Sequence, residues 1–305
     1  TDLLYSVAVP ATSGYQTMLK NIGSIENQGY ELSIESDNLT GAFSWTTAFN
    51  IAFNRNKVLE LGGEEYKEMA EGDGHLKTGS VRRLIVGEPI GVFYGYRFDG
   101  IFQNEEECKQ QTSSASPIGV GLRRYKDLNG DGKVDAANDR EILGDANPKF
   151  FGGLTNTFAY KGFELNVFLQ YSYGNKILNY NAMELENPTG GQNAYADMVN
   201  RWTPENPYSE GPRTWDRENQ YWINNDNTYF MRNANYLRLK NIELGYTFNF
   251  EGLKKAGISN LRLYTNGTNL ITIDGVKDAD PEQRDASLGG YPLRKIINFG
   301  VQATF

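Results

Sequence analysis

The segment with the clearest chemical signature begins at Asp127. The run Asp127-Leu128-Asn129-Gly130-Asp131-Gly132-Lys133-Val134-Asp135 matches the first nine positions of an EF-hand calcium loop. Calcium takes hard oxygen ligands at alternate positions, and the chain turns sharply at a glycine in the sixth place. We predict that Ca²⁺ is bound by the residues that supply these oxygens, namely Asp127, Asn129, Asp131, the carbonyl of Lys133, and Asp135 or Asp139.

This loop departs from the EF-hand pattern at its twelfth position. Asn138 stands where an acid is usual, and Asp139 follows one residue later. The closing ligand therefore requires a one-residue bulge or comes from elsewhere. Helices do not obviously flank the loop, so we expect a structural calcium ion rather than a regulatory EF-hand. The alternative is a polar, Asx-rich turn without a metal.

A second acidic run, Asp278-Ala279-Asp280-Pro281-Glu282, could suggest the carboxylate pair of a glycosidase. The two acids of such a pair face each other across a sugar, and residues this close in sequence rarely do so. We therefore predict that this run orders its loop and has no catalytic role.

Aromatic residues in the longest polar segment offer different chemistry, because flat rings can stack on sugar rings. The candidates are Trp202, Trp215, Tyr221 and Trp222. The alternative is that they form a small core that keeps the loop folded.

Other reactive residue types are scarce. Cys108 is the single cysteine and allows no internal disulfide, and His75 is the single histidine, too few for a zinc site or a Ser-His-Asp triad. No phosphate loop, dinucleotide fingerprint or nucleophile elbow is present, so we predict no catalytic residue and no enzymatic activity. The net charge of -8 argues against a nucleic-acid partner. We interpret the pairs Arg82-Arg83 and Arg123-Arg124 as solvated surface.

The elements that must position these residues are indicated by alternating side chains. The run from Phe163 to Tyr173 has a bulky apolar residue at every odd position and mostly polar residues between. A strand repeats its side-chain direction every two residues, so one face is apolar and the other polar. The same pattern recurs at 43–54 and 295–305, in runs of about ten residues, the length of a tilted membrane-crossing strand. We predict that Phe163, Leu165, Val167, Leu169 and Tyr171 face lipid, and that Glu164, Asn166, Gln170 and Ser172 face a water-filled lumen.

We therefore expect an all-β fold, a transmembrane antiparallel β-barrel with short periplasmic turns and long extracellular loops. Strands are expected near residues 3–9, 28–37, 42–54, 149–160, 163–174, 237–250, 260–271 and 295–305. Short links such as Lys161-Gly162 alternate with long polar segments, as in an up-and-down barrel. The apolar run from Gly91 to Phe98 is expected to belong to an extracellular hairpin. The alternative is that it is one of two extra crossings.

Several runs occur in an order that resembles the SusC/RagA family of TonB-dependent outer-membrane transporters. They are Asn21 to Leu32, Phe43-Ser44-Trp45, Asn54 to Val58, Gly91 to Tyr96, Asp99 to Phe102, Tyr125 to Gly132, Asn147 to Phe150, Arg201 to Pro207, Tyr236 to Asn241, Asp280-Pro281-Glu282 and the terminal Phe305. The resemblance covers nearly the whole chain. It corresponds to the C-terminal third or so of such a protein.

The resemblance implies that residues 1–305 are the C-terminal part of one barrel of about 22 strands in the outer membrane of a Gram-negative bacterium. It also implies active import of a glycan, or in some members of an oligopeptide, with a SusD-like surface lipoprotein as lid and energy supplied through TonB. The family's N-terminal extension, TonB box and plug have no counterpart in this sequence, so we expect a fragment of a longer protein. The other functions considered are a passive porin and an outer-membrane enzyme or adhesin that uses its loops.

Overall fold

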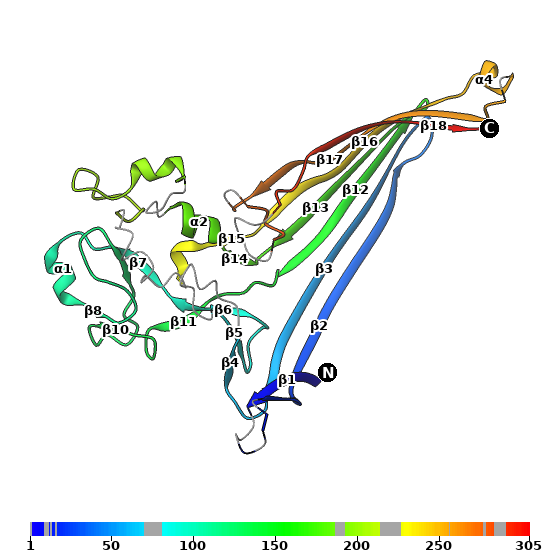
Figure 1. The fold of residues 1–305 in the computed structure, drawn as a ribbon. Coiled ribbons are helices and arrows are strands. Elements are labelled where there is room, and N and C mark those ends of the chain that lie inside the picture. The colour runs from blue at the N-terminus through cyan, green and yellow to red at the C-terminus, as the bar shows by residue number, and fades with distance from the viewer. Residues whose placement is uncertain are drawn as a thin grey trace.

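The computed structural model describes residues 2–8, 12, 14–15, 17–69, 81–186, 193–213, 227–255, 257–276, 279–283 and 291–305. Its dominant element is an eight-stranded antiparallel sheet with the order β1-β2-β3-β12-β13-β16-β17-β18 (Figure 1). These strands are β1 (Asp2–Ala8), β2 (Thr17–Leu39), β3 (Phe43–Leu61), β12 (Phe150–Tyr160), β13 (Phe163–Tyr173), β16 (Tyr236–Phe248), β17 (Asn260–Asp274) and β18 (Ile296–Thr304). All eight expected strands are therefore confirmed. Across the described ranges, no helix has the length and apolar character needed to span a membrane.

Two strands extend well past the lengths expected from alternation. β2 has 23 residues and β3 has 19, and their pairing continues beyond Gly29 and Asn54 as far as Gly23 and Leu61. The extension does not keep the two-residue alternation, because Val58, Leu59 and Leu61 follow the polar run from Arg55 to Lys57, so alternation does not mark it. Val58 and Leu61 are buried in a small cluster with Leu84. The backbone groups of the extension still pair, because a ladder of N–H and C=O bonds needs no apolar side chains. In Figure 1 both strands project beyond the neighbouring ends of β12 and β13.

The short connections gather at one end of the sheet. Lys161 and Gly162 join β12 to β13 with φ values of 46° and 89°, and left-handed residues of this kind are typical of a tight hairpin turn. The short helix α4 (Glu251–Lys255) links β16 to β17 at the same end (Figure 1). The long connections leave the opposite end. The expected sorting of short turns and long loops is therefore confirmed.

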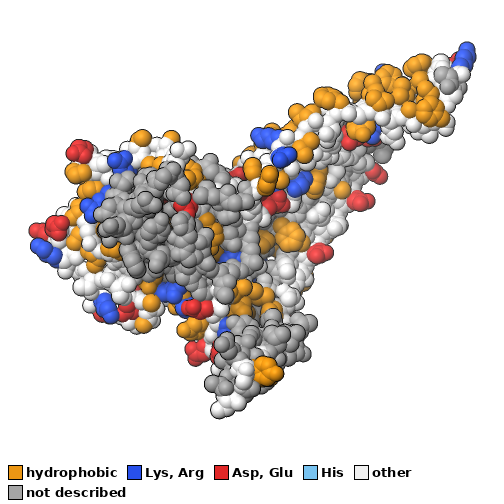
Figure 2. Space-filling view, in the orientation of Figure 1, with side chains coloured by type: hydrophobic (Ala, Val, Ile, Leu, Met, Phe, Trp, Pro, Cys, Tyr) orange, Lys and Arg blue, Asp and Glu red, His pale blue; other side chains and the backbone are white. Residues whose placement is uncertain are grey.

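The register gives the sheet two chemically different faces. Asn166 on β13 donates to Thr157 on β12, and Arg262 on β17 lies 2.8 Å from Glu164 and 2.9 Å from Glu243. The opposite face carries exposed apolar side chains, including Leu32, Ile34, Phe53, Phe163, Leu237, Leu244, Leu263, Ile297, Phe299 and Val301. Figure 2 shows apolar side chains gathered along the sheet towards α4. The alternation of β13 is confirmed, and the contact of its two faces with lipid and lumen stays a prediction.

A β-bulge in β16 changes which residues lie on the polar face. Lys240 is skipped in the pairing of β16 with β13. Without this bulge, Arg238 would share the apolar face with Ile242, because four residues separate them. With the bulge, Leu239 shares that face, and Arg238 turns to the polar face directly opposite Gln170.

The side chain of Tyr171, on the apolar face of β13, extends across the neighbouring strand β12 at the position of a glycine. Its hydroxyl donates to the backbone carbonyl of Asn50 on β3 at 2.8 Å, passing over Gly152 of β12. A Cβ atom at Gly152 would lie 2.1 Å from that carbonyl oxygen and 2.6 Å from the Tyr171 hydroxyl. The glycine therefore lets a polar hydroxyl find a partner on an apolar surface, where an unpaired one is costly.

The long connections fold into a region of short elements, called here the outer region. It contains β4 (Tyr66–Glu68), β5 (Arg82–Ile85), β6 (Val92–Tyr96), β7 (Phe98–Ile101), α1 (Glu105–Gln110), β8 (Thr112–Ser113), β9 (Arg123–Tyr125), β10 (Lys133–Val134), β11 (Arg140–Gly144), β14 (Lys176–Leu178), α2 (Tyr180–Leu185), η2 (Ala196–Asn200), η3 (Thr228–Phe230) and β15 (Met231–Asn233). Its largest described core cluster includes Phe93, Leu178, Met183 and Phe230, so distant connections pack together.

The segment 91–102 does not cross with the wall strands. β6 pairs with β5 and β11, and β7 pairs with β9, in two small sheets of the outer region. The alternative of two extra crossings is therefore wrong. The expected hairpin is confirmed, because β6 pairs antiparallel with β5, the strand that directly precedes it. Its extracellular position stays a prediction.

Arg82, Arg83 and Arg123 contradict the interpretation of the arginine pairs as solvated surface. Their exposed fractions are 5%, 8% and 4%. The Arg83 guanidinium lies 3.9 Å from the centroid of the Tyr94 ring, and that of Arg123 lies 4.7 Å from the Phe230 ring. A planar guanidinium stacks on aromatic rings and is weakly hydrated, which permits its burial. The sequence did not show this because the rings come from other segments.

Candidate functional site

An arginine on the polar face of the wall binds two acids of a distant loop. Arg238 is 1% exposed, and its Nη2 lies 2.8 Å from Oδ1 of Asp280. Its Nη1 pairs with Glu282, and its Nε donates to the hydroxyl of Thr272 at 3.0 Å. Two carboxylates and one hydroxyl therefore accept from this guanidinium, so the buried charge is paired and hydrogen-bonded.

Glu282 collects further donors from the same wall. Oε1 of Glu282 accepts from the Tyr236 hydroxyl and from the Gln170 amide, each at 3.0 Å. The Lys240 ammonium lies 3.7 Å from Oε2. We call Arg238, Asp280 and Glu282 with these partners the wall clamp. It ties residues 279–283 to β13, β16 and β17, so the predicted loop-ordering role is confirmed for Asp280 and Glu282. Asp278 lies outside the described residues.

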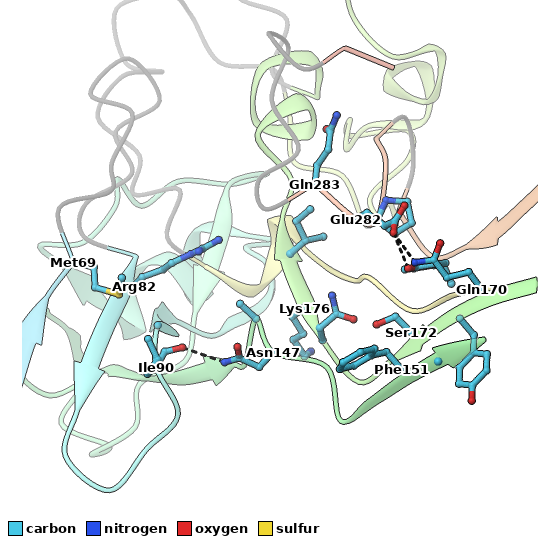
Figure 3. A pocket seen from close by; sticks show the side chains of 18 residues that line it. Met69, Arg82, Ile90, Asn147, Phe151, Gln170, Ser172, Lys176, Glu282 and Gln283 are labelled. Carbon is cyan, nitrogen blue, oxygen red and sulfur yellow. Dashed lines mark hydrogen bonds between the residues drawn. The ribbon is translucent and has the colours of Figure 1, made fainter. Parts of the chain in front are cut away.

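The wall clamp forms one side of a cavity of about 510 Å³ (Figure 3). Gln170 and Ser172 of β13 line its wall side, and Met69, Arg82 and Ile90 of the outer region line the opposite side. Asn147, Asn175, Lys176 and Gln283 complete it. We call this cavity the wall pocket, since it lies where the polar face of the sheet meets the outer region.

The wall pocket offers several acceptor groups together with the ammonium of Lys176. The side-chain nitrogen of Asn147 donates to Asp145 at 2.7 Å and to the Ile90 carbonyl at 3.2 Å, which leaves the amide oxygen available. Gln170 likewise uses its amide nitrogen on Glu282. The Asn175 Oδ1 is buried without a hydrogen-bond partner. Buried polar atoms are normally bonded, so an unpaired one suggests a site for water or a ligand.

A larger hollow of about 1210 Å³ lies in the outer region. Tyr208 at its rim is 94% exposed, and Tyr229 is part of its lining. Burial raises the pKa of Tyr229, and Glu186 raises it further, so this phenol stays protonated. Tyr208 is a free ring for stacking that the sequence analysis did not select, because a lone tyrosine in a polar loop gives no periodic signal.

The predicted stacking residues fall in two groups. Trp202 is 7% exposed, and its indole N–H donates to Gln103 at 3.2 Å. A Cβ atom at Gly121 would lie 2.6 Å from the Trp202 ring, so the ring packs tightly on the backbone. This placement agrees with the loop-core alternative for Trp202. Trp215, Tyr221 and Trp222 lie outside the described residues, and their stacking role stays a prediction.

The predicted calcium loop is ordered by its own hydrogen bonds. Both carboxylate oxygens of Asp127 accept backbone N–H groups, from Gly130 and Gly132 at 2.7 Å. Asp139 is 0% exposed and accepts from the backbone of Leu128 at 2.8 Å and of Asp135 at 2.7 Å. Asp139 thus holds the loop through backbone N–H groups, and its predicted role as the closing calcium ligand stays a prediction.

The side chains of this loop are not gathered around a point. Within the described part of the chain, no three His, Cys, Asp or Glu side chains come close enough to hold a metal. The Lys133 ammonium lies 3.0 Å from Asp135, and this bond holds the pKa of that carboxyl below its ordinary value. Calcium binding through Asp135 would therefore have to displace Lys133 from that carboxylate.

Sequence reasoning missed Arg238, Asn175 and Lys176. In β16 the apolar residues Ile242 and Leu244 stand at even positions, and an unbroken alternation would put Arg238 on the same face. A charged residue at a position that alternation assigns to the apolar face was the available signal. Asn175 and Lys176 follow the outer end of β13 without any motif, and only the packing of the outer region against the wall brings them to the pocket.

Known proteins with similar sequences are TonB-dependent receptors. The chain is 38% identical over its whole length to TonB-dependent receptor P3 of Formosa agariphila, of which it covers 31%, and 31% identical to receptor P26 of the same organism. It is 27% identical to TonB-dependent receptor SusC of Bacteroides thetaiotaomicron, of which it covers 29%. No family model matches the chain.

The solved structures agree on the fold. The structure of the RagAB peptide transporter matches with a TM-score of 0.78 at 23% identity, over 99% of this chain and 32% of that chain. The 'open-open' state of the RagAB peptide importer matches with a TM-score of 0.77 at 24% identity, over 100% of this chain and 31% of that chain.

A two-faced antiparallel wall with short turns at one end and a folded outer region at the other defines part of an outer-membrane β-barrel. The chain belongs to the SusC/RagA family of TonB-dependent receptors, and its location is the outer membrane of a Gram-negative bacterium. The chain spans about a third of the length of these relatives (31% of receptor P3). The relatives are receptors and transporters, and the predicted absence of enzymatic activity agrees with this.

The wall clamp gives a direct stability prediction. In the full-length protein, Arg238→Met should free residues 279–283, because Asp280 and Glu282 lose their buried partner. Losing one member of a buried pair costs about 3 kcal/mol, or roughly a hundredfold faster amide exchange at Glu282 and Gln283 by hydrogen–deuterium exchange. Arg262→Met, which removes the guanidinium at the other end of the wall, should leave exchange there unchanged. Equal protection of Glu282 in wild type and Arg238→Met would show that the clamp does not hold the loop.

Proposed function

We propose that this chain forms barrel wall and outer vestibule of a TonB-dependent importer that brings an oligosaccharide across the outer membrane. The observation that carries the proposal is the wall pocket, a polar cavity on the inward face at the junction with the outer region. A substrate entering from outside would meet this cavity before the lumen. Sites for small ligands are concave and place a few fixed polar groups around the ligand.

The polar groups of the wall pocket favour a sugar over a peptide. The amide oxygens of Asn147, Gln170 and Asn175 are available as hydrogen-bond acceptors, and Ser172 adds a hydroxyl. A sugar ring presents several hydroxyl donors in a small volume, whereas a peptide presents one backbone N–H per residue. An oligopeptide is the second candidate, because the structural neighbours are described as a peptide transporter.

We also propose that a SusD-like surface lipoprotein covers the outer region, and that TonB supplies energy through parts of the protein beyond these residues. The size of the outer region and the likeness to SusC and RagAB support this assignment. A permanent partner should bury about 2,000 Å² or more in total. On the outer region, Tyr208 and Val199 are 94% and 78% exposed, as expected for side chains that a partner covers.

This proposal predicts both a partner and energy dependence. The full-length protein, purified gently from its own membrane, should bring a second, lipidated protein with it. Uptake of a labelled oligosaccharide by whole cells should fall to background when either TonB or that lipoprotein is deleted. Uptake that persists without TonB would indicate a passive porin. If the barrel is purified alone, and uptake is unchanged after deletion of the lipoprotein, the transporter works without a lid.

The calcium site is a separate proposal, supported by the spacing of Asp127, Asn129 and Asp131 and by the glycine turn between them. With calcium bound, six to eight oxygens at about 2.3–2.6 Å should surround the ion. The purified full-length protein should lose one calcium ion per chain on Asp131→Ala, measured by elemental analysis. Asp99→Ala, an acid that pairs with Arg124 outside the loop, should not change the calcium content. An equal calcium content in wild type and Asp131→Ala would show that this loop is an Asx-rich turn without a metal.

A further inference from the structure

We propose that the wall pocket is a subsite for an acidic sugar, whose carboxylate or sulfate group is held by the ammonium of Lys176. This inference rests on the proposed glycan import and adds a chemical class of substrate to it. Lys176 lies among the lining residues between the outer-region side and the wall side of the cavity (Figure 3).

The charge balance of the wall pocket favours an anion. Glu282 is the only acid among the described lining residues, and Arg238 and Lys240 together offset the charges of Glu282 and Asp280. Within the described residues, no carboxylate pairs with Lys176. The cavity therefore carries a positive charge that a bound anion would balance, and a partly enclosed site screens this attraction less than bulk water does.

The position of Lys176 is fixed by the fold. Its backbone N–H donates to the Asp145 carbonyl at 2.8 Å, and β14 pairs with β15. Its aliphatic stem lies against Gly144, where a Cβ atom would come within 2.4 Å of the Lys176 Cδ. The missing side chain at Gly144 thus makes room for the stem. Holding a long side chain in place before binding lowers the entropy lost when it captures an anion.

Neighbouring groups suit the rest of a sugar. Asn175 is adjacent to Lys176 in sequence, and its buried Oδ1 has no hydrogen-bond partner. The amide oxygens of Asn147 and Gln170 face the same cavity. One cation beside several acceptors fits a ring that combines one anionic substituent with hydroxyl donors. A neutral sugar would leave the Lys176 ammonium without a counter-charge.

Binding of matched oligosaccharides tests the proposal. The full-length transporter with its partner is applied to an array in which each uronate or sulfate ester stands beside its neutral parent. Wild type should bind at least one acidic member about tenfold more tightly than its neutral parent. This ratio corresponds to one charged hydrogen bond of moderate strength. Comparison of the uronates with the sulfate esters then shows whether the bound group is a carboxylate or a sulfate. Lys176→Gln should abolish this preference, Lys176→Arg should keep most of it, and raised salt should weaken it.

Lys161→Gln provides the matched control, because this lysine lies in the turn at the opposite end of the wall and should keep the preference. An acid preference that survives in Lys176→Gln, or equal binding of every acidic and neutral pair by wild type, overturns the assignment of Lys176 and leaves glycan import intact. Binding of no sugar by a protein that takes up oligopeptides overturns both proposals.

Discussion

Backbone pairing is the constraint on which the rest of this structure depends. Lipid offers no partner for an N–H or C=O group, so each strand in a membrane wall must bond to its neighbours along its length. Pairing fixes the register, and register fixes which side chains face each side, because a shift of one residue reverses every side chain. The polar contacts of Arg262 and the apolar surface around Phe299 both follow from this register.

The bulge at Lys240 shows how a local exception to this constraint creates the site. It turns Arg238 inward at the outer end of β16, where Asp280 and Glu282 can reach it. The clamp then holds residues 279–283 against the wall, and this segment becomes one side of the wall pocket. One skipped residue in the ladder therefore connects the barrel wall to the fold of a loop.

The sequence predicted the parts of the fold that follow from alternation. The run from Phe163 to Tyr173 is apolar at each odd position, and β13 occupies those residues. The outer halves of β2 and β3 were missed because the two-residue alternation lapses there, whereas the backbone ladder continues. The buried arginines were misread because their aromatic partners are distant in sequence. Asp280 and Glu282 were recognised as loop-ordering acids, whereas Lys176 and Asn175 become part of a site only through tertiary packing.

The switch of faces at Lys240 can be measured directly in a bilayer. Single cysteines would be placed at positions 237–246 of the full-length protein, after Cys108→Ser, and spin-labelled for accessibility to oxygen and to a water-soluble nickel chelate. The account predicts oxygen maxima at Leu237 and Leu239, and then at Ile242, Leu244 and Tyr246, so the parity changes from odd to even at the bulge. An unbroken two-residue alternation through Lys240, with Arg238 on the oxygen-accessible face, would contradict it.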